Sequence, residues 1–325
     1  MRKACLVILC IIYGAIACAQ QSYDRKIVKY SSKDGLSYGF ITGIVQDDNG
    51  FIWLSTEDGL NRFDGINFKV FKHNAANPNS LPSNYIDFMY KDTEGAIWLS
   101  TRQGIYQFNT NTEKYVKFKP GASISVNDLT TITSVKNIVW FSTYTNGVFS
   151  YNKKTGSFQN FNLKHIAPAI PNSATFSFQD SKGLLWVGAE TTMSVFTTVD
   201  GQVKKCLNDK IPVNRVPAGR VNAIVEDEYS NIWFATNTGM AVYKRAQNQM
   251  VVFNGPAYQM RSNNFSSLLQ DNDHNLLIGL QDGGLYRLDL QKATAADFKN
   301  IAIQAVKTED NFTVTERTVF RLYMD

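Results

Sequence analysis

The chain has 325 residues, of which 44% are hydrophobic and 19% charged, so it is long enough for one large globular domain or two small ones, and its composition excludes a disordered protein. Its net charge of +5 is too small to indicate binding to nucleic acid or to an anionic membrane surface. Aromatic residues make up 13%, and with the frequent short clusters of Gly and Asn they favour strands joined by tight turns.

The first 19 residues have the pattern of a secretory signal peptide. Arg2 and Lys3 precede an apolar run of about 15 residues, and Ala17-Cys18-Ala19 forms a small-x-small cleavage pattern. Lipidation of the cysteine is the alternative, but the residue three positions earlier is alanine rather than the leucine of a lipoprotein signal. We therefore expect a signal peptide at 1–19, a mature domain at 20–325 and a periplasmic location.

Cleavage would leave little that indicates a disulfide, a metal site or a membrane anchor. The net charge would fall to +3, because Arg2 and Lys3 are lost and no acid is. Only Cys206 would remain of the four cysteines, which excludes an internal disulfide and a cysteine-based metal site. No other apolar run approaches 18 residues, so we expect no membrane-spanning helix in the mature chain.

A repeated segment organises the mature chain. The stretch DDNGFIWLSTEDGLNRFDG begins at Asp47, and its frame returns as DTEGAIWLSTRQGIYQFNT at Asp92 and as DEYSNIWFATNTGMAVYKR at Asp227. All five tryptophans occupy one slot of this frame, at spacings of 45, 42, 46 and 47 residues, and a leucine fills the sixth slot 44 residues later. The slot residues are Trp53, Trp98, Trp140, Trp186, Trp233 and Leu277.

Periods of about 40–50 residues with short strands and glycine turns are typical of β-propeller blades. Helical solenoids have similar periods, but they need helical apolar spacing, whereas these segments alternate with period two. In the first repeat we expect strands at 40–47, 51–56, 59–64 and 66–72 (strands a to d). The sequence therefore predicts an all-β propeller of four-stranded antiparallel blades, with six complete repeats and an incomplete seventh blade.

The tryptophan slot is expected to lie between blades. A large rigid ring would fill space between adjacent sheets that smaller side chains would leave as a cavity. Small residues two positions later would let the neighbouring backbone approach closely: Ser55, Ser100, Ser142, Gly188, Ala235 and Gly279. The turn aspartates would bond backbone N–H groups. We therefore assign these residues to building the blades rather than to contacting a ligand.

Both ends of the mature chain have the pattern of single strands of the seventh blade. Residues 24–37 are typical of a strand d without partners, and residues 317–325 of a strand a that stops at Asp325, the acid that opens the next turn. We hypothesise that the chain is part of something longer, which an in-frame Gly-x-Ile-Trp phrase downstream of Asp325 would support. Unpaired strand edges there predict low stability or association, so a homodimer is a further expectation.

The frame resembles the two-component regulator propeller repeat. It is intact in DNGFIWLSTEDGL and TEGAIWLSTRQGI, looser in KNIVWFSTYTNGV and SKGLLWVGAETTM, and weakest in the sixth repeat, which lacks the tryptophan. A second recurring phrase precedes each first strand, as in LSYGFITGIVQD and VPAGRVNAIVED. The resemblance extends over essentially the whole mature chain.

The resemblance implies the periplasmic sensor region of a hybrid two-component system of Bacteroidetes. Such proteins have two seven-bladed propellers, an immunoglobulin-like connector, a membrane helix, kinase and receiver domains and an AraC-type DNA-binding end, and they respond to oligosaccharides. Only the signal and most of the first propeller match this chain. The resemblance therefore implies an oligosaccharide ligand, a second propeller or the rest of a sensor kinase as partner, and no kinase or nucleic-acid contact within these residues.

Catalytic motifs are scarce. The three histidines, His73, His165 and His274, occupy unrelated repeat positions without metal-binding spacing, and no nucleophile elbow, phosphate loop or dinucleotide fingerprint is present. We therefore expect no catalytic residue, no metal and no cofactor. The Asp-x-x-Gly-x-x-Trp pattern partly resembles the Asp-box of sialidases, but that box is itself a structural turn and does not indicate an enzyme.

Candidate ligand-binding residues vary at a fixed place in the frame. The turns between strands b and c and the connections from strand d to the next strand a lie on one face of a propeller, where ligands commonly bind. Carboxylates, amides and arginine bind sugar hydroxyls, and aromatic rings stack on the C–H faces of sugars. The candidates are Arg102, Tyr144, Tyr85, Glu57, Asn237, Gln281 and Arg220, with the first three preferred. The alternative for each is a solvated loop residue.

The predicted function is therefore non-catalytic sensing of an oligosaccharide. One alternative is a secreted propeller lyase or hydrolase acting on glycans, which would need titratable residues clustered on one rim and is disfavoured by the scarcity of histidine. The other alternative is a scaffold that holds a partner protein and binds no sugar.

Overall fold

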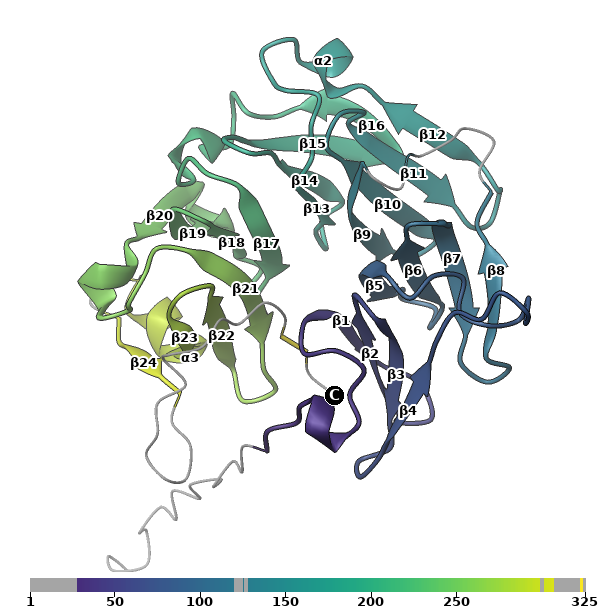
Figure 1. Cartoon of the computed structure of the whole chain (residues 1–325). Coiled ribbons are helices and arrows are strands. Elements are labelled where there is room, and N and C mark those ends of the chain that lie inside the picture. The colour runs from purple at the N-terminus through teal and green to yellow at the C-terminus, as the bar shows by residue number, and fades with distance from the viewer. Residues whose placement is uncertain (1–27, 120–124, 126–127, 299–300, 307–321, 324–325) are drawn as a thin grey trace, which may run out of the picture.

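The protein is described here by a computed structural model that covers residues 28–119, 125, 128–298, 301–306 and 322–323. Six four-stranded antiparallel sheets are arranged around a common axis (Figure 1), which confirms the predicted propeller with six complete blades. In every blade the strands lie in sequence order, with the first strand nearest the axis. The expected signal peptide at 1–19 lies outside the described residues.

The first three blades extend to residue 161. From the axis outwards, their strands are β1 (Ile41–Gln46), β2 (Ile52–Thr56), β3 (Gly59–Phe63) and β4 (Phe68–Phe71); β5 (Ile86–Lys91), β6 (Ile97–Thr101), β7 (Gly104–Asn109) and β8 (Lys114–Lys117); and β9 (Leu129–Val135), β10 (Ile138–Thr143), β11 (Val148–Asn152) and β12 (Phe158–Phe161).

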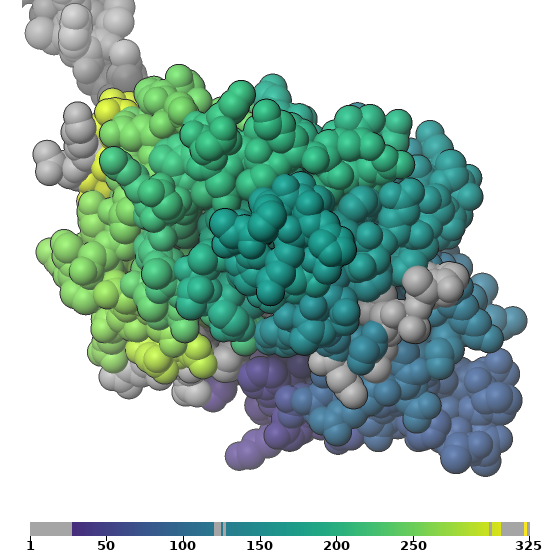
Figure 2. Space-filling view, turned by 90° about the horizontal axis from the view of Figure 1, so that it is seen from above, coloured from purple at the N-terminus to yellow at the C-terminus, as the bar shows by residue number. Residues whose placement is uncertain are grey.

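The last three blades follow the same order. Their strands are β13 (Phe176–Gln179), β14 (Leu184–Gly188), β15 (Met193–Val199) and β16 (Gln202–Cys206); β17 (Val221–Glu226), β18 (Ile232–Thr236), β19 (Gly239–Lys244) and β20 (Gln249–Phe253); and β21 (Phe265–Gln270), β22 (Asn275–Leu280), β23 (Gly284–Asp289) and β24 (Ile303–Ala305). Seen from the side, the middle blades form a continuous surface in teal and green (Figure 2).

Short helical turns occupy some of the connections. They are η1 (Ser32–Asp34), α2 (Leu163–Ile166), η2 (Val213–Arg215), η3 (Arg245–Gln247), η4 (Gly255–Tyr258) and α3 (Leu290–Ala295). Within the described residues, none of the helices has the length and apolar character needed to span a membrane.

Each tryptophan packs against the blade that follows it. All five are fully buried, and each belongs to a hydrophobic cluster that contains residues of the next blade. The Trp53 ring lies 4.8 Å from the Phe108 ring of the second blade, centroid to centroid. This confirms the predicted position of the tryptophans between blades. Leu277, in the sixth slot, is only half-buried.

The turn aspartate also fixes the tryptophan, which the sequence analysis missed. Asp47 Oδ1 accepts hydrogen bonds from the backbone N–H groups of Asn49 and Phe51, as predicted, and Asp47 Oδ2 accepts one from the Trp53 indole at 2.8 Å. The indole–carboxylate bond recurs three times, as Trp98–Asp92 at 3.1 Å, Trp186–Asp180 at 2.8 Å and Trp233–Asp227 at 2.8 Å.

Two blades lack one member of this pair and replace it. The third blade has no aspartate at this turn, where Val135 pairs with Ile138, and the Trp140 indole donates instead to Gln179 Oε1 of the fourth blade at 3.0 Å. The sixth blade has no indole, and Asn275 Nδ2 donates to Asp271 Oδ1 at 3.0 Å. A buried indole donor left without a partner is costly, which explains the bond from Trp140 to Gln179. The fifth blade makes the equivalent asparagine bond, from Asn231 Nδ2 to Asp227 Oδ2 at 3.1 Å, beside its indole bond.

Close approach between blades explains the glycine at position 188. A Cβ atom there would lie 2.4 Å from Val221 Cβ of the fifth blade. We expect Gly188→Ala to lower the free energy of unfolding by about 1–3 kcal/mol, because the overpacked contact forces the blades to shift. Urea unfolding measures the effect. Gly39→Ala, where a Cβ meets nothing within 4 Å, is the control and should change little; equal losses in the two variants would contradict this explanation.

A β-bulge at the start of the innermost strand links one blade to the next. In β1, β5, β17 and β21 the pairing register shifts at the second residue, and a bulge re-aims the side chain it carries. The second residue of the innermost segment then donates to the backbone of the following blade: Thr42 to Ile86 O at 2.8 Å, Thr130 to Ala174 O at 2.7 Å, Thr175 to Val221 O at 3.1 Å and Asn222 to Phe265 O at 2.7 Å.

Salt bridges between blades reach two of the buried turn aspartates. Lys153 Nζ of the third blade lies 2.9 Å from Asp92 Oδ2, and Arg245 Nη2 of the fifth lies 2.7 Å from Asp180 Oδ2. Burial alone would raise the pKa of Asp92, but hydrogen bonds from Lys153, the Trp98 indole and backbone amides outweigh it, and the pKa lies below its ordinary value.

The packing between the sixth and first blades differs from the packing between the other neighbouring blades. Hydrophobic clusters join the other five neighbouring pairs of blades, but among the described residues no such cluster joins these two. The expected incomplete seventh blade is not seen in the described residues. Residues 28–31 form no strand, η1 follows them, and most of the expected strand at 317–325 lies outside the described part of the chain.

Candidate functional site

The b–c turns position the candidate side chains on one face, here called the rim face. In the first blade Thr56 Oγ1 donates to Gly59 O at 2.9 Å and accepts from the Asp58 N–H at 3.0 Å. Gly59 has a φ of 123°, which favours glycine, so the turn is closed tightly and Glu57 stands at its tip. The second blade repeats this geometry around Arg102, since Thr101 Oγ1 donates to Gly104 O at 3.0 Å.

The structure brings together three predicted residues where the first and second blades meet. The Tyr85 hydroxyl donates to Glu57 Oε1 at 3.0 Å, and the Arg102 guanidinium lies over the Tyr85 ring, 3.8 Å from its centroid. Glu57 and Tyr85 are half-buried and Arg102 is exposed. The guanidinium covers one face of the Tyr85 ring, so only the other face is available for stacking on a sugar. The main role of Tyr85 is therefore to hold Arg102 and Glu57 in place.

Asp87 joins these residues, and the sequence analysis did not select it. It is the bulge residue of β5, two positions after Tyr85, and it is exposed. An alignment of the six repeats would have found it, because Asp87 is the only acid at its position. The residues there are Thr42, Asp87, Thr130, Thr175, Asn222 and Ser266. We call Glu57, Tyr85, Asp87 and Arg102 the seam cluster.

Electrostatic coupling connects the seam cluster. The hydrogen bond to Glu57 and, after it, burial raise the pKa of Tyr85, and Arg102 opposes them. The pKa of Asp87 is raised first by the partial desolvation of its carboxyl group and further by Glu57, against the opposing effect of Arg102. The cluster therefore presents two carboxylates, one guanidinium and one phenol at the inner mouth of the rim face.

A second group on the rim face contains Tyr144 and Arg220. The Arg220 guanidinium lies 5.5 Å from the centroid of the Tyr144 ring, which joins the turn of the third blade to the connection before the fifth. The Asn237 N–H donates to Arg220 O at 3.1 Å, so this predicted residue lies beside them. Gln281 is not part of either group, because its side-chain oxygen accepts a hydrogen bond from Asn264 Nδ2 at 3.0 Å.

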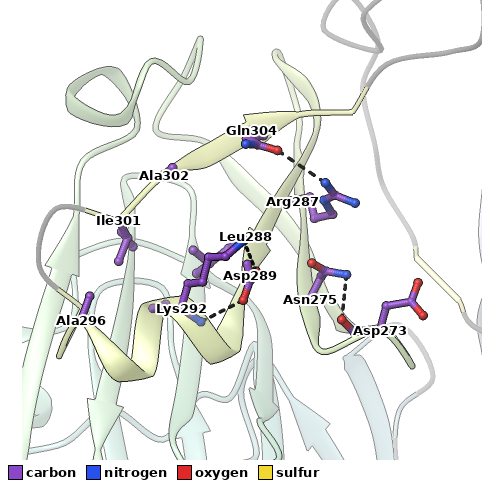
Figure 3. Close-up of a pocket in the computed structure, with 11 residues that line it drawn as sticks. Asp273, Asn275, Arg287, Leu288, Asp289, Lys292, Ala296, Ile301, Ala302 and Gln304 are labelled. Atoms are coloured by element: carbon purple, nitrogen blue, oxygen red, sulfur yellow. Dashed lines mark hydrogen bonds and ion pairs between the residues drawn. The ribbon is translucent and has the colours of Figure 1, made fainter. Parts of the chain in front are cut away.

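A pocket of about 520 Å³ lies elsewhere, on the sixth blade between α3 and β24 (Figure 3). None of the predicted candidates lines it. Its polar groups are largely paired with one another: Lys292 Nζ lies 2.9 Å from Asp289 Oδ2, and Arg287 Nη2 donates to Gln304 Oε1 at 3.4 Å. Because these pairings would have to be broken by a ligand, we regard the rim face as the better candidate.

Groups suited to metal binding are not seen in the described part of the chain, where no three His, Cys, Asp or Glu residues gather at one place. Two of the histidines have ring contacts with residues outside the seam cluster. His73 Nδ1 contacts Leu81 O at 2.8 Å, and His274 Nδ1 contacts Glu228 Oε2 at 2.7 Å.

Comparisons with known proteins agree with this fold. The family model described as "two component regulator propeller" matches residues 35–58 and 215–238, which belong to the repeats of the first and fifth blades. Histidine kinase P4 of Formosa agariphila is 36% identical over 67 residues, which are 21% of this chain and 5% of the kinase.

Solved structures show the same architecture. The extracellular domain of a hybrid two-component system of B. thetaiotaomicron aligns with a TM-score of 0.72 at 24% identity, over 92% of this chain and 39% of that domain. Virginiamycin B lyase of Staphylococcus aureus aligns with a TM-score of 0.58 at 14% identity, over 76% of this chain and 80% of the lyase. At these identities the structures support the fold alone. The chain is a β-propeller in which two segments, residues 35–58 and 215–238, match the two-component regulator propeller model.

Proposed function

We propose that this propeller is a non-catalytic, exported ligand-binding region of a hybrid two-component sensor, and that its rim face binds an oligosaccharide. The seam cluster carries the proposal. It gathers charged and aromatic side chains from two blades at the mouth of the rim face, where Arg102 is stacked on Tyr85 at 3.8 Å and Tyr85 is bound to Glu57.

The chemistry of the cluster suits sugar hydroxyls. A hydroxyl group donates to a carboxylate and accepts from a guanidinium, and both partners are present here within one cluster. Stacking on Tyr85 restricts Arg102 before a ligand arrives, which lowers the entropy lost on binding. In a complete sensor, the ligand would favour one of two receptor arrangements and so pass the signal inward.

Calorimetry of the protein against a panel of oligosaccharides tests the proposal. We expect saturable binding of at least one glycan, and we expect Arg102→Ala to raise its Kd about 10- to 100-fold, because a hydrogen bond to a charged group contributes about 1.5–3 kcal/mol. Gln103→Ala, an exposed change on the same turn, is the control and should leave the Kd unchanged.

The same incubations test the two alternatives. Product analysis by chromatography should show every glycan intact, and the appearance of cleaved products would overturn the non-catalytic part of the proposal. Absence of heat with all glycans, together with a stable protein partner, would favour the scaffold instead.

A further inference from the structure

Asp87 lacks a hydrogen bond between blades that the equivalent residue makes in four other blades. At the second position of the innermost segment, Thr42, Thr130, Thr175 and Asn222 each donate a side-chain hydrogen bond to a carbonyl of the following blade. In the second blade the same position, in the same kind of bulge, is an aspartate. An ionised carboxylate has no hydrogen to donate, so Asp87 cannot form this bond.

The carboxylate of Asp87 is therefore left at the mouth of the propeller. The residue is exposed, and in the described part of the chain its carboxylate forms no hydrogen bond to the side chain or backbone of another residue. Bulges often re-aim a side chain beside a functional site. Asp87 lacks the interblade bond and its side chain is exposed, so its carboxylate can contact a ligand without first breaking an internal bond.

The charge around Asp87 is unbalanced. Glu57 and Asp87 act on each other as like charges, and Arg102 is the cation that opposes them. The neighbouring Asp58 adds little, because it is paired with Lys72 at 2.6 Å. Two carboxylates and one guanidinium give the seam cluster a net charge of −1 when all three are ionised.

We infer that Asp87 makes the seam cluster select uncharged, hydroxyl-rich saccharides and reject saccharides that carry carboxylate or sulfate groups. The inference rests on the proposed function. Sugar hydroxyls can donate to both carboxylates and accept from Arg102, whereas an anionic substituent that approaches Arg102 meets Asp87 and Glu57 as well. Specificity then comes from a repulsive element as much as from an attractive one.

Glycan pairs that differ in charge alone test this inference. The probes are oligogalacturonates and their methyl esters, desulfated and sulfated galactans, and neutral hexose oligosaccharides, titrated into the full chain by calorimetry at low ionic strength. For whichever pair binds, we expect the wild-type chain to favour the neutral member at least about tenfold. Asp87→Asn should reduce that preference several-fold by removing the charge.

A second variant, Asp87→Thr, tests the same charge without the risk of misfolding, because three other blades have threonine at this position. It should regain the bond to the following blade, show a Tm at or above that of the wild type, and also lose the preference for neutral glycans. Asp282→Asn, an exposed acid on the rim of the sixth blade, is the matched control and should leave the preference unchanged.

The outcomes separate the two proposals. Equal or tighter binding of the anionic member, or a preference that Asp87→Asn and Asp87→Thr leave intact, would overturn the inference while the proposed function stands. Failure of every probe to bind the wild-type chain would overturn the proposed function and the inference with it.

Discussion

Replacing Trp233 with alanine is expected to lower the free energy of unfolding by about 3–5 kcal/mol, which is a large part of the stability of an ordinary domain. The side chain is fully buried, and its ring lies 5.6 Å from the Phe253 ring of its own blade and 5.6 Å from the Phe298 ring in the sixth blade's c–d connection. Its removal would leave a cavity between the blades. It would also take from the Asp227 carboxylate the indole donor at 2.8 Å.

Two further variants divide this loss into packing and hydrogen bonding. Trp233→Phe keeps most of the ring and removes one donor to Asp227 Oδ2, which still accepts from Asn231 Nδ2 at 3.1 Å. It should therefore cost about 0.5–1.5 kcal/mol, the net contribution of one hydrogen bond. Leu277→Ala alters the same slot in the sixth blade, where the residue is half-buried, and should cost less than Trp233→Ala. Urea unfolding followed by circular dichroism measures all three, and equal losses at Trp233 and Leu277 would contradict a wedge between blades.

Lys153→Met is expected to lower the free energy of unfolding by about 3 kcal/mol, because it leaves the buried Asp92 carboxylate without its cation. Asp92 is fully buried and the Lys153 side chain is only 12% exposed, so water replaces the ammonium poorly. The double variant Asp92→Asn with Lys153→Met should lose less than the sum of the two single changes, because neither charge then remains buried alone.

The loss at Lys153 should depend on pH. The folded-state pKa of Asp92 lies below its ordinary value of 3.8, so the stability it contributes is fully present above the unfolded pKa and is lost as the pH falls through the folded pKa. The difference in unfolding free energy between the wild-type and Lys153→Met chains should therefore be constant near neutral pH and shrink below about pH 4. A difference that persists unchanged into acid would show that the salt bridge is not its cause.

Much of the fold could be predicted from the sequence because one large residue recurs at a nearly constant interval. A tryptophan every 42–47 residues, followed by a small residue and a glycine turn, leaves few architectures that could use it repeatedly. The bond from four of the indoles to the aspartate six residues earlier was missed, because those residues lie on different sides of a turn and only the folded hairpin brings them together. The expected seventh blade stays a prediction.

The candidate site could be predicted only in part. The frame placed Glu57, Tyr85 and Arg102 on one face, but their mutual contacts depend on the register between two blades, which no local pattern encodes. Asp87 was missed because the variable polar residues that indicate a ligand site lie in loops and turns, whereas this residue lies within a strand. Its side chain is available to solvent only because a bulge turns it and because it lacks the hydrogen that Thr42 and its equivalents donate.

A crystal structure of the full chain with a neutral oligosaccharide that calorimetry shows to bind would test the central claim most directly. The account predicts sugar density at the inner mouth of the rim face, with hydroxyl groups within hydrogen-bonding distance of Arg102 and Asp87. Sugar found instead in the pocket of the sixth blade between α3 and β24, with the seam cluster empty, would contradict it.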